Sequence, residues 1–266
     1  MAKKKTNKKE YIPWEITTNR FVGIIDIMGF KDLVARNDHE TVYQMMKKVS
    51  HAMRVNQSVF AVDSESENFD INIIMMTYSD SIMIYSRDDS ESSQENFIAS
   101  ISALSEDLFK DGIPHKGGVA FGKMTLDFEN SIFFGQPLID AYLLQEELNL
   151  YGIVAHPTAE FENEFYEDET VIEYNCPFKT GYAKHYTILP GTFFADPFTI
   201  EEFEILYKSV SALRINTSGG LRKYIDNTLS YLTYSKDIYL KRIEDYENSL
   251  EEEEGEENPK KNGLPF

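Results

Sequence analysis

Two aspartates, Asp26 and Asp80, occupy positions where the chain is predicted to turn. Asp26 ends the short β-branched run of residues 21–26, where a predicted strand gives way to a helix. Asp80 lies in the predicted turn of a β-hairpin, in the sequence Tyr-Ser-Asp-Ser. Taken alone, each aspartate would serve as a helix cap or as a turn residue. If the first strand lies beside the hairpin, the two carboxylates meet and repel unless a cation lies between them, and such oxygen ligands favour Mg²⁺ or Mn²⁺.

The segment that follows Asp26 is predicted to complement a metal site. Residues 27–31 lead into a helix, so we expect their backbone N–H groups to be free to bind phosphate. Gly29 would let a ligand approach the backbone closely. Metal ions beside a phosphate site indicate a nucleoside triphosphate. The expected nucleotide contacts in this segment are Ile27, Met28, Gly29, Phe30 and Lys31.

Helical and strand patterns alternate around these segments, which predicts an α+β fold of helices and antiparallel strands. The predicted helices cover residues 40–58, 96–109, 137–150, 199–212 and 221–248, and the predicted strands cover residues 21–26, 71–78, 81–85, 116–123, 131–135 and 151–155.

The composition excludes several classes of protein. The net charge is −19, whereas a protein that follows nucleic-acid phosphates normally has a basic excess. No stretch reaches the roughly 20 apolar residues that span a bilayer, and no apolar run of signal-peptide length follows the basic N-terminus. The single cysteine, Cys176, excludes an intrachain disulfide. We therefore expect a cytoplasmic protein with no nucleic-acid or membrane partner.

Together the motifs resemble those of the class III nucleotidyl cyclases. The shared features are Asp-Ile-x-Gly-Phe at residues 26–30, the hairpin turn with its aspartate, a glycine-rich segment at 116–122, and a helix start at residues 135–141, Gly-Gln-Pro-Leu-Ile-Asp-Ala, which is similar to the family's Gly-x-Pro-x-x-(Asn or Asp)-x-Ala. The resemblance covers roughly residues 21–155. It implies a ferredoxin-like βαββαβ core with an antiparallel sheet.

The resemblance also implies roles for single residues. Asp26 and Asp80 would be catalytic and would bind two Mn²⁺ or Mg²⁺ ions, together with the carbonyl group of Ile27. Asp140 falls at the position of the family's transition-state asparagine and is the third expected catalytic residue. The arginine one helical turn later is absent, because Leu144 stands near its position.

The positions expected to read the base differ from those of adenylate cyclases. Met76 stands where those enzymes have a lysine, and the second position falls at Ile132 or Phe133. These departures are similar to those of the Pycsar pyrimidine cyclases, short cyclase domains with a Ser-Asp-Ser turn. The resemblance implies that UTP or CTP is converted to cyclic UMP or cyclic CMP, which activates a downstream effector during phage infection. Lys116 and Lys123 are candidates for charge stabilisation.

Cyclases of this family have their pocket between two cyclase domains, so the resemblance implies a homodimer of this one-domain chain. An adenylate or guanylate cyclase, or an inactive module of the same fold that binds a nucleotide or a partner, is the alternative. The expected organisation is a disordered basic arm at residues 1–18, a catalytic domain at 19–190, a helical C-terminal extension at 191–250 and a disordered acidic tail at 251–266.

Overall fold

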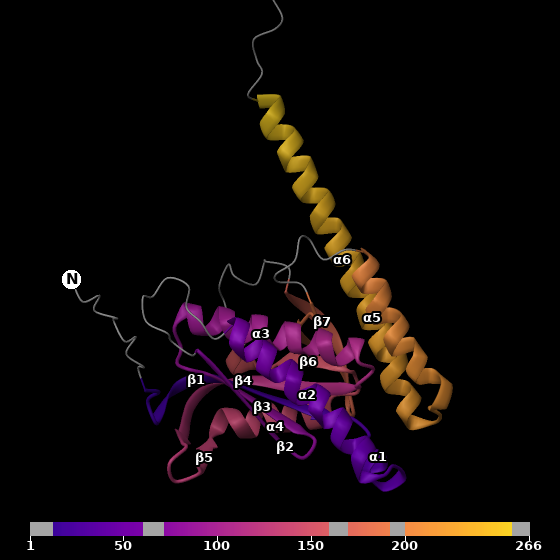
Figure 1. The fold of residues 1–266 in the computed structure, drawn as a ribbon. Coiled ribbons are helices and arrows are strands. Elements are labelled where there is room, and N and C mark those ends of the chain that lie inside the picture. The colour runs from indigo at the N-terminus through magenta and orange to yellow at the C-terminus, as the bar shows by residue number, and fades with distance from the viewer. Residues whose placement is uncertain (1–12, 61–71, 160–169, 192–199, 257–266) are drawn as a thin grey trace, which may run out of the picture.

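One sheet of eight strands organises the molecule, and a computed structural model describes residues 13–60, 72–159, 170–191 and 200–256 of it. The strand order is β2-β3-β1-β4-β6-β8-β7, with β5 paired to β4 (Figure 1). The strands are β1 (Thr17–Ile27), β2 (Ile73–Tyr78), β3 (Ser81–Ser86), β4 (His115–Asp127), β5 (Ile132–Gly135), β6 (Gly152–Ala155), β7 (Val171–Phe178) and β8 (Gly181–Ile188).

The central strand β1 is antiparallel to both of its neighbours, β3 and β4. Two helices, α1 (Phe30–Arg36) and α2 (His39–Phe60), follow β1, and α3 (Glu91–Lys110) connects β3 to β4. This order of elements is the predicted βαββαβ core, and the predicted α+β fold is confirmed. The remaining helix of the domain, α4 (Gln136–Glu147), connects β5 to β6, which is parallel to β4.

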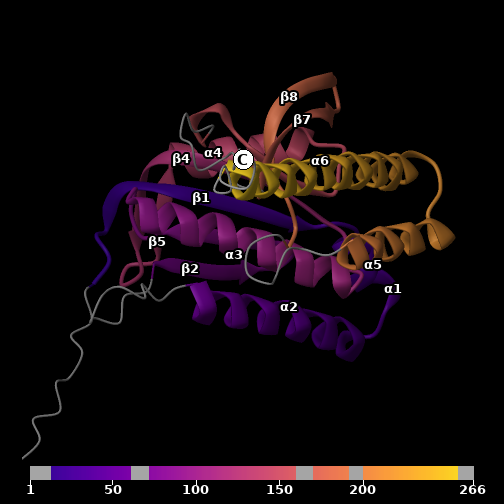
Figure 2. The ribbon, with the colours of Figure 1, turned by 90° about the horizontal axis from the view of Figure 1, so that it is seen from above.

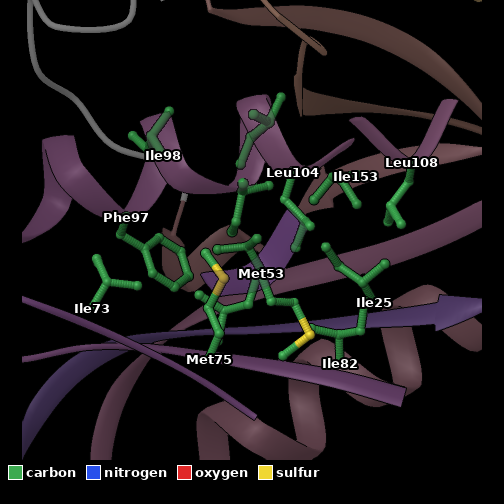
Figure 3. Close-up of a cluster of buried hydrophobic side chains, with 14 of the residues drawn as sticks. Ile25, Met53, Ile73, Met75, Ile82, Phe97, Ile98, Leu104, Leu108 and Ile153 are labelled. Carbon is green, nitrogen blue, oxygen red and sulfur yellow. The ribbon is translucent and has the colours of Figure 1, made fainter. Parts of the chain in front are cut away.

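Successive residues of β1 point to opposite faces of the sheet, as expected for a strand buried on both sides. Ile25 and Ile27 contribute to a large apolar cluster with α2 and α3. Figure 3 shows Met53 of α2 and Leu104 of α3 meeting β1 and β2 there. On the other face, Ile24 packs with α4. The side chain of Asp26 is therefore on the α4 face of the sheet.

The C-terminal extension consists of α5 (Ile200–Ala212), a short 3₁₀ turn and the long α6 (Gly220–Glu256). Its apolar side chains form a second core with Phe109 of α3 and with Tyr151, which precedes β6. Figure 2 shows α5 beside the end of α3, and α6 projects beyond the sheet in Figure 1. No helix in the described ranges has the length and apolarity needed to cross a membrane.

The structure revises two predicted boundaries. β1 begins at Thr17, inside the segment predicted to be a disordered arm, because pairing with β4 extends to Thr125. α6 continues to Glu256, six residues into the predicted disordered tail. The added residues are mostly glutamates, which have a high helix propensity. The rest of the predicted arm and tail, residues 1–12 and 257–266, lies outside the described ranges.

Candidate active site

The end of β1 and the β2–β3 hairpin meet at one edge of the sheet. The last pair of the β1–β3 ladder is Asp26 with Ser81, and the N–H of Ile27 donates to the carbonyl oxygen of Asp80 at 2.8 Å. The hairpin turn has only two residues, and Ser79 is left-handed, with φ of 59°. The structure thus brings Asp26 and Asp80 together, as the sequence predicted.

The electrostatics of Asp26 reflect this arrangement. Burial in the first place and the negative charge of Asp80 in the second raise the pKa of Asp26 to about 6, while Lys116 opposes the shift. Two carboxylates that repel each other in a partly buried position form a site that favours a bound cation.

The residues present fit a divalent metal ion whose coordination is completed by the phosphates of its substrate. Among the residues that the structure describes, no three His, Cys, Asp or Glu side chains gather as a metal site would require. Mg²⁺, however, is commonly bound by one or two carboxylates plus the phosphates of the substrate. The N–H of Met28 donates to Pro114, on the side away from the hairpin, so the Ile27 carbonyl of the same trans peptide points to the hairpin side.

Only some of the backbone N–H groups that were predicted to bind phosphate, at residues 27–31, are free to do so. The N–H of Ile27 is used by Asp80, and that of Met28 donates to the carbonyl of Pro114 at 2.8 Å. These two N–H groups therefore cannot bind phosphate, a correction that follows from β1 pairing to its last residue. Gly29 precedes α1 with φ of 79°, and nothing lies within 4 Å of where its side chain would start. The N–H groups at residues 29–31 begin the helix and are the ones left for a ligand.

The side chains of this segment point in different directions. Phe30 packs against the large core, Met28 packs against the C-terminal helices, and Lys31 is exposed on α1. Only Lys31 therefore presents its side chain to solvent beside Gly29.

The two candidate lysines on β4 lie far apart. Lys116 pairs directly with Asp26, so the two side chains share the α4 face of the sheet. Lys123 pairs with Asn19, seven residues along the strand, which is roughly 23 Å away. Lys123 therefore cannot reach the site of its own chain, which corrects the prediction. The sequence showed both lysines on one strand but did not show the register of that strand against Asp26.

Asp140 lies on α4 and does not join the two aspartates in the same chain. Its carboxylate accepts a hydrogen bond from the Gln136 side-chain amide at 2.8 Å. The part of α4 beside Lys116 is its last turn, near Glu146, which is about 9 Å along the helix from Asp140. Leu144, where the family has an arginine, packs into an apolar cluster and supplies no charge.

The two expected base-reading residues lie in one cluster. Met76 of β2 and Phe133 of β5 both pack against one buried apolar cluster, which includes Tyr85 and Met124. Ile132, the alternative position, is 48% exposed and lies outside this cluster. Phe133 is therefore the better candidate of the two, and both base-reading positions are apolar.

Glu146 is a residue of the site that the sequence did not reveal. Its charge contributes to raising the pKa of Asp26, and it acts on Lys116 as well. No motif in the sequence points to it, because Glu146 is one of two adjacent glutamates at the end of a predicted helix. The negative charges of Asp80 and Glu146 both act on Asp26, and only Lys116 opposes them, which again favours a bound cation.

His115 is also part of this region, at the start of β4 opposite Ile27. It is fully buried, Nδ1 donates to the carbonyl of Ile113 at 3.0 Å, and Nε2 accepts from the hydroxyl of Ser105 at 2.7 Å. Burial lowers the pKa of His115 to about 4. The imidazole is thus a neutral structural link between α3 and the site.

This buried histidine predicts a loss of stability in acid. Between pH 6.5 and about 4 the unfolded chain protonates His115 while the folded chain does not, so folding weakens as the pH falls. At pH 4 this costs about 3 kcal/mol relative to pH 7. Urea denaturation of the wild type and of His115→Gln across this range isolates the effect, because other groups titrate alike in both. An unfolding free energy difference that stays constant with pH would contradict it.

Comparison with known proteins supports the fold. Neither the family models nor the curated proteins give a match to this sequence. Among solved structures, the catalytic core of a rhodopsin-guanylyl cyclase with converted specificity, in complex with ATPαS, superposes with a TM-score of 0.50 at 11% identity, covering 65% of this chain and 96% of that chain. The monomeric guanylyl cyclase domain of the RhoGC fusion protein from the aquatic fungus Blastocladiella emersonii gives 0.50 at 12% identity, covering 65% and 95%. The chain therefore has the fold of a class III cyclase catalytic domain, followed by helices of its own.

Proposed function

We propose that this protein is a pyrimidine nucleotide cyclase, which converts UTP or CTP to the 3′,5′-cyclic monophosphate and pyrophosphate. The observation that supports this most is the meeting of Asp26 and Asp80, joined through the Ile27 N–H at 2.8 Å. A module that had lost catalysis would not need two carboxylates held in mutual repulsion. The protein would act in the cytoplasm as the signal-generating enzyme of a Pycsar antiphage system, with an effector that responds to its product.

In the reaction, the ribose O3′ forms a bond to the α-phosphorus and the bond to the bridging oxygen of the β-phosphate breaks. Pyrophosphate leaves, and the hydroxyl proton passes to solvent. Asp26, Asp80 and the Ile27 carbonyl would hold two Mn²⁺ or Mg²⁺ ions. Such ions acidify the attacking hydroxyl and neutralise the phosphates. The chain itself orients the substrate and supplies charge, as is general for phosphoryl transfer.

Three features of the chain would bind the triphosphate. The N–H groups at residues 29–31 offer donors to phosphate oxygens. Nothing lies within 4 Å of where a side chain of Gly29 would start, so a ligand can approach the backbone there. Lys116 adds positive charge next to Asp26. Lys31 extends from the first turn of α1 and is exposed.

The preference for a pyrimidine rests on the apolar cluster around Met76 and Phe133. Met76 stands where adenylate cyclases have a lysine, so that contact to a purine base is missing here, and Phe133 offers a ring for stacking. A purine cyclase is the second candidate, because the solved structures of this fold described above are guanylyl cyclase domains and one of them holds ATPαS.

Incubation of the full-length chain with each of the four nucleoside triphosphates and Mn²⁺, followed by mass spectrometry, tests these candidates. The proposal expects cyclic UMP or cyclic CMP as the main product. A cyclic purine nucleotide as the main product would favour the second candidate. Nucleotide binding without any cyclic product would mean an inactive module of the cyclase fold.

A homodimer is part of this proposal. α4 exposes large apolar side chains at helical spacing, with Asp140 next to them in sequence, and β5 exposes two more. If two chains meet there, Asp140 can serve the site of the partner subunit rather than its own. The exposed side chains are Ile132 (48%), Phe134 (61%), Ile139 (51%), Tyr142 (49%) and Leu143 (55%).

We expect Leu143→Arg to convert the dimer to a monomer and to lower activity at least tenfold, because a charge in the centre of an apolar interface is left without a partner. Light scattering at the assay concentration measures the mass. Leu221→Arg is the matched control, since Leu221 is 53% exposed on α6 and away from this face. A wild-type chain that is fully active as a monomer would refute the dimer.

A further inference from the structure

The C-terminal helices contact the candidate site on two sides. Met28, two residues after Asp26, packs into the core formed by α5 and α6. Lys116, which pairs with Asp26 across the sheet, lies 5.9 Å from the ring of Tyr224 in the first turns of α6. An appendage that merely adds stability has no need to contact both neighbours of a catalytic carboxylate.

Lys116 is held in an enclosed position. The residue is 4% exposed, and its ammonium donates to the carbonyls of Glu146 at 3.3 Å and Leu148 at 3.5 Å. These carbonyls end α4, where the helix dipole favours a positive charge. Both hydrogen bonds are long, so they alone restrain the flexible lysine side chain weakly.

The ring of Tyr224 lies beside the ammonium, with its centroid 5.9 Å from Nζ. The same ring stacks on Tyr151, with 5.6 Å between centroids and 20° between planes. A cation beside an aromatic face is attracted by the ring, and the attraction is stronger where water is excluded.

The first turns of α6 are fastened to the loop between α4 and β6. The backbone N–H of Tyr151 donates to the hydroxyl of Thr228 at 2.9 Å, and the Asn227 amide donates to the carbonyl of Asn149 at 2.7 Å. The loop and Tyr224 are therefore fixed relative to each other. The position of the Tyr224 ring is thus determined by the catalytic domain itself.

We propose that Tyr224 is a positioning residue of the cyclase, whose ring holds the Lys116 ammonium at the end of α4 and beside Asp26. This inference rests on the proposed function and adds to it, because it places part of the site on the C-terminal extension. The ammonium then keeps its positive charge in one place beside Asp26 and needs no ordering when the substrate binds.

Three variants of the full-length chain test the inference. Tyr224→Leu removes the ring, and Tyr224→Phe keeps the ring and removes only the hydroxyl. Tyr234→Leu is the matched control: Tyr234 is another α6 tyrosine that packs on a sheet tyrosine, Tyr174, with 5.2 Å between ring centroids, on β7 rather than at the site.

The first measurement needs no activity. Acylation of Lys116 by an amine reagent, followed by mass spectrometry, reports how well the ammonium is enclosed. We expect Tyr224→Leu to raise the labelling rate about tenfold over wild type, and Tyr224→Phe and Tyr234→Leu to leave it within about twofold, as only the first opens the enclosure. Equal labelling in all four proteins would overturn the inference while leaving the proposed function intact.

The second measurement is the kinetics with the nucleotide that the wild type cyclises. Tyr224→Leu is expected to lower kcat about tenfold with the same change in melting temperature as Tyr234→Leu, and Tyr224→Phe to restore most of the loss. Equal losses of kcat in Tyr224→Leu and Tyr234→Leu would mean a structural role only. A wild type inactive on all four nucleotides would instead refute the proposed function, and with it the role of Tyr224 in the reaction.

Discussion

Asp26→Asn is expected to lower the rate of nucleotide cyclisation by about 10³-fold or more. At the same time it is expected to make the metal-free protein more stable. The activity falls because the site loses one of two carboxylates that would hold the divalent cations, and a bound metal contributes several kcal/mol of charge stabilisation. Asp80→Asn is expected to lose activity similarly. The structure supports this pairing, since Asp80 is a principal cause, after burial, of the raised pKa of Asp26.

The stability gain follows from the direction of that pKa shift. Asp26 has a pKa of about 6 in the folded chain, against 3.8 as its ordinary value. Between these values the folded chain holds a proton that the unfolded chain releases, so the carboxylate weakens folding as the pH rises and the full cost is present above pH 6. Two pKa units correspond to almost 3 kcal/mol, but Asp26 is only half-buried, so solvent screening reduces the gain to about 1 kcal/mol.

Thermal unfolding at pH 7.5 with a chelator present measures this gain, and the nucleotide assay measures the loss of activity. Asp89→Asn is the control, since Asp89 is an exposed aspartate in the loop before α3 and should change neither quantity. An Asp26→Asn protein that retains cyclase activity would rule out the proposed metal site. A variant less stable than wild type would contradict the electrostatic account of Asp26.

Gly118→Ala is expected to destabilise the protein by about 3 kcal/mol, at the upper end of the usual cost of overpacking. Gly118 lies in β4, where α4 crosses the sheet so closely that a Cβ would overlap the carbonyl oxygen of Ala141 and lie 3.1 Å from its carbonyl carbon. These are backbone atoms, so α4 itself has to move. Because the last turn of α4 binds the Lys116 ammonium, the same displacement should also lower activity.

Chemical denaturation compares Gly118→Ala with Gly220→Ala. Nothing lies within 4 Å of the Cβ that would be added at Gly220, which begins α6 with no positive φ. Alanine also favours helix over glycine, so the control should be neutral or slightly stabilising. Equal stability of the two variants would show that α4 does not pack on β4 as closely as the structure has it.

The local part of the site was predictable from the sequence. The run before Asp26 and the Ser-Asp turn at Asp80 identified a strand and a hairpin, and both are present in the structure. The meeting of the two aspartates needed one further assumption, that the hairpin pairs with the first strand. The β1–β3 ladder confirms this assumption.

The parts that the sequence did not predict depend on register and on contacts between distant segments. The assignment of Lys123 failed because strand register decides which β4 lysine faces Asp26. The N–H groups of Ile27 and Met28 were expected to be free, but each one has a carbonyl partner brought by another segment. The contact of Tyr224 with Lys116 joins residues more than 100 positions apart, and no local pattern indicates it.

The most direct test of the metal site is a Mn²⁺ titration, followed by electron paramagnetic resonance, in the presence of 3′-deoxy-UTP, which lacks the attacking hydroxyl. If Asp26 and Asp80 bind the cations next to the triphosphate, the wild type should bind Mn²⁺ with the nucleotide, and Asp80→Asn should bind it at least tenfold more weakly. Equal Mn²⁺ affinity in the two proteins would contradict the account.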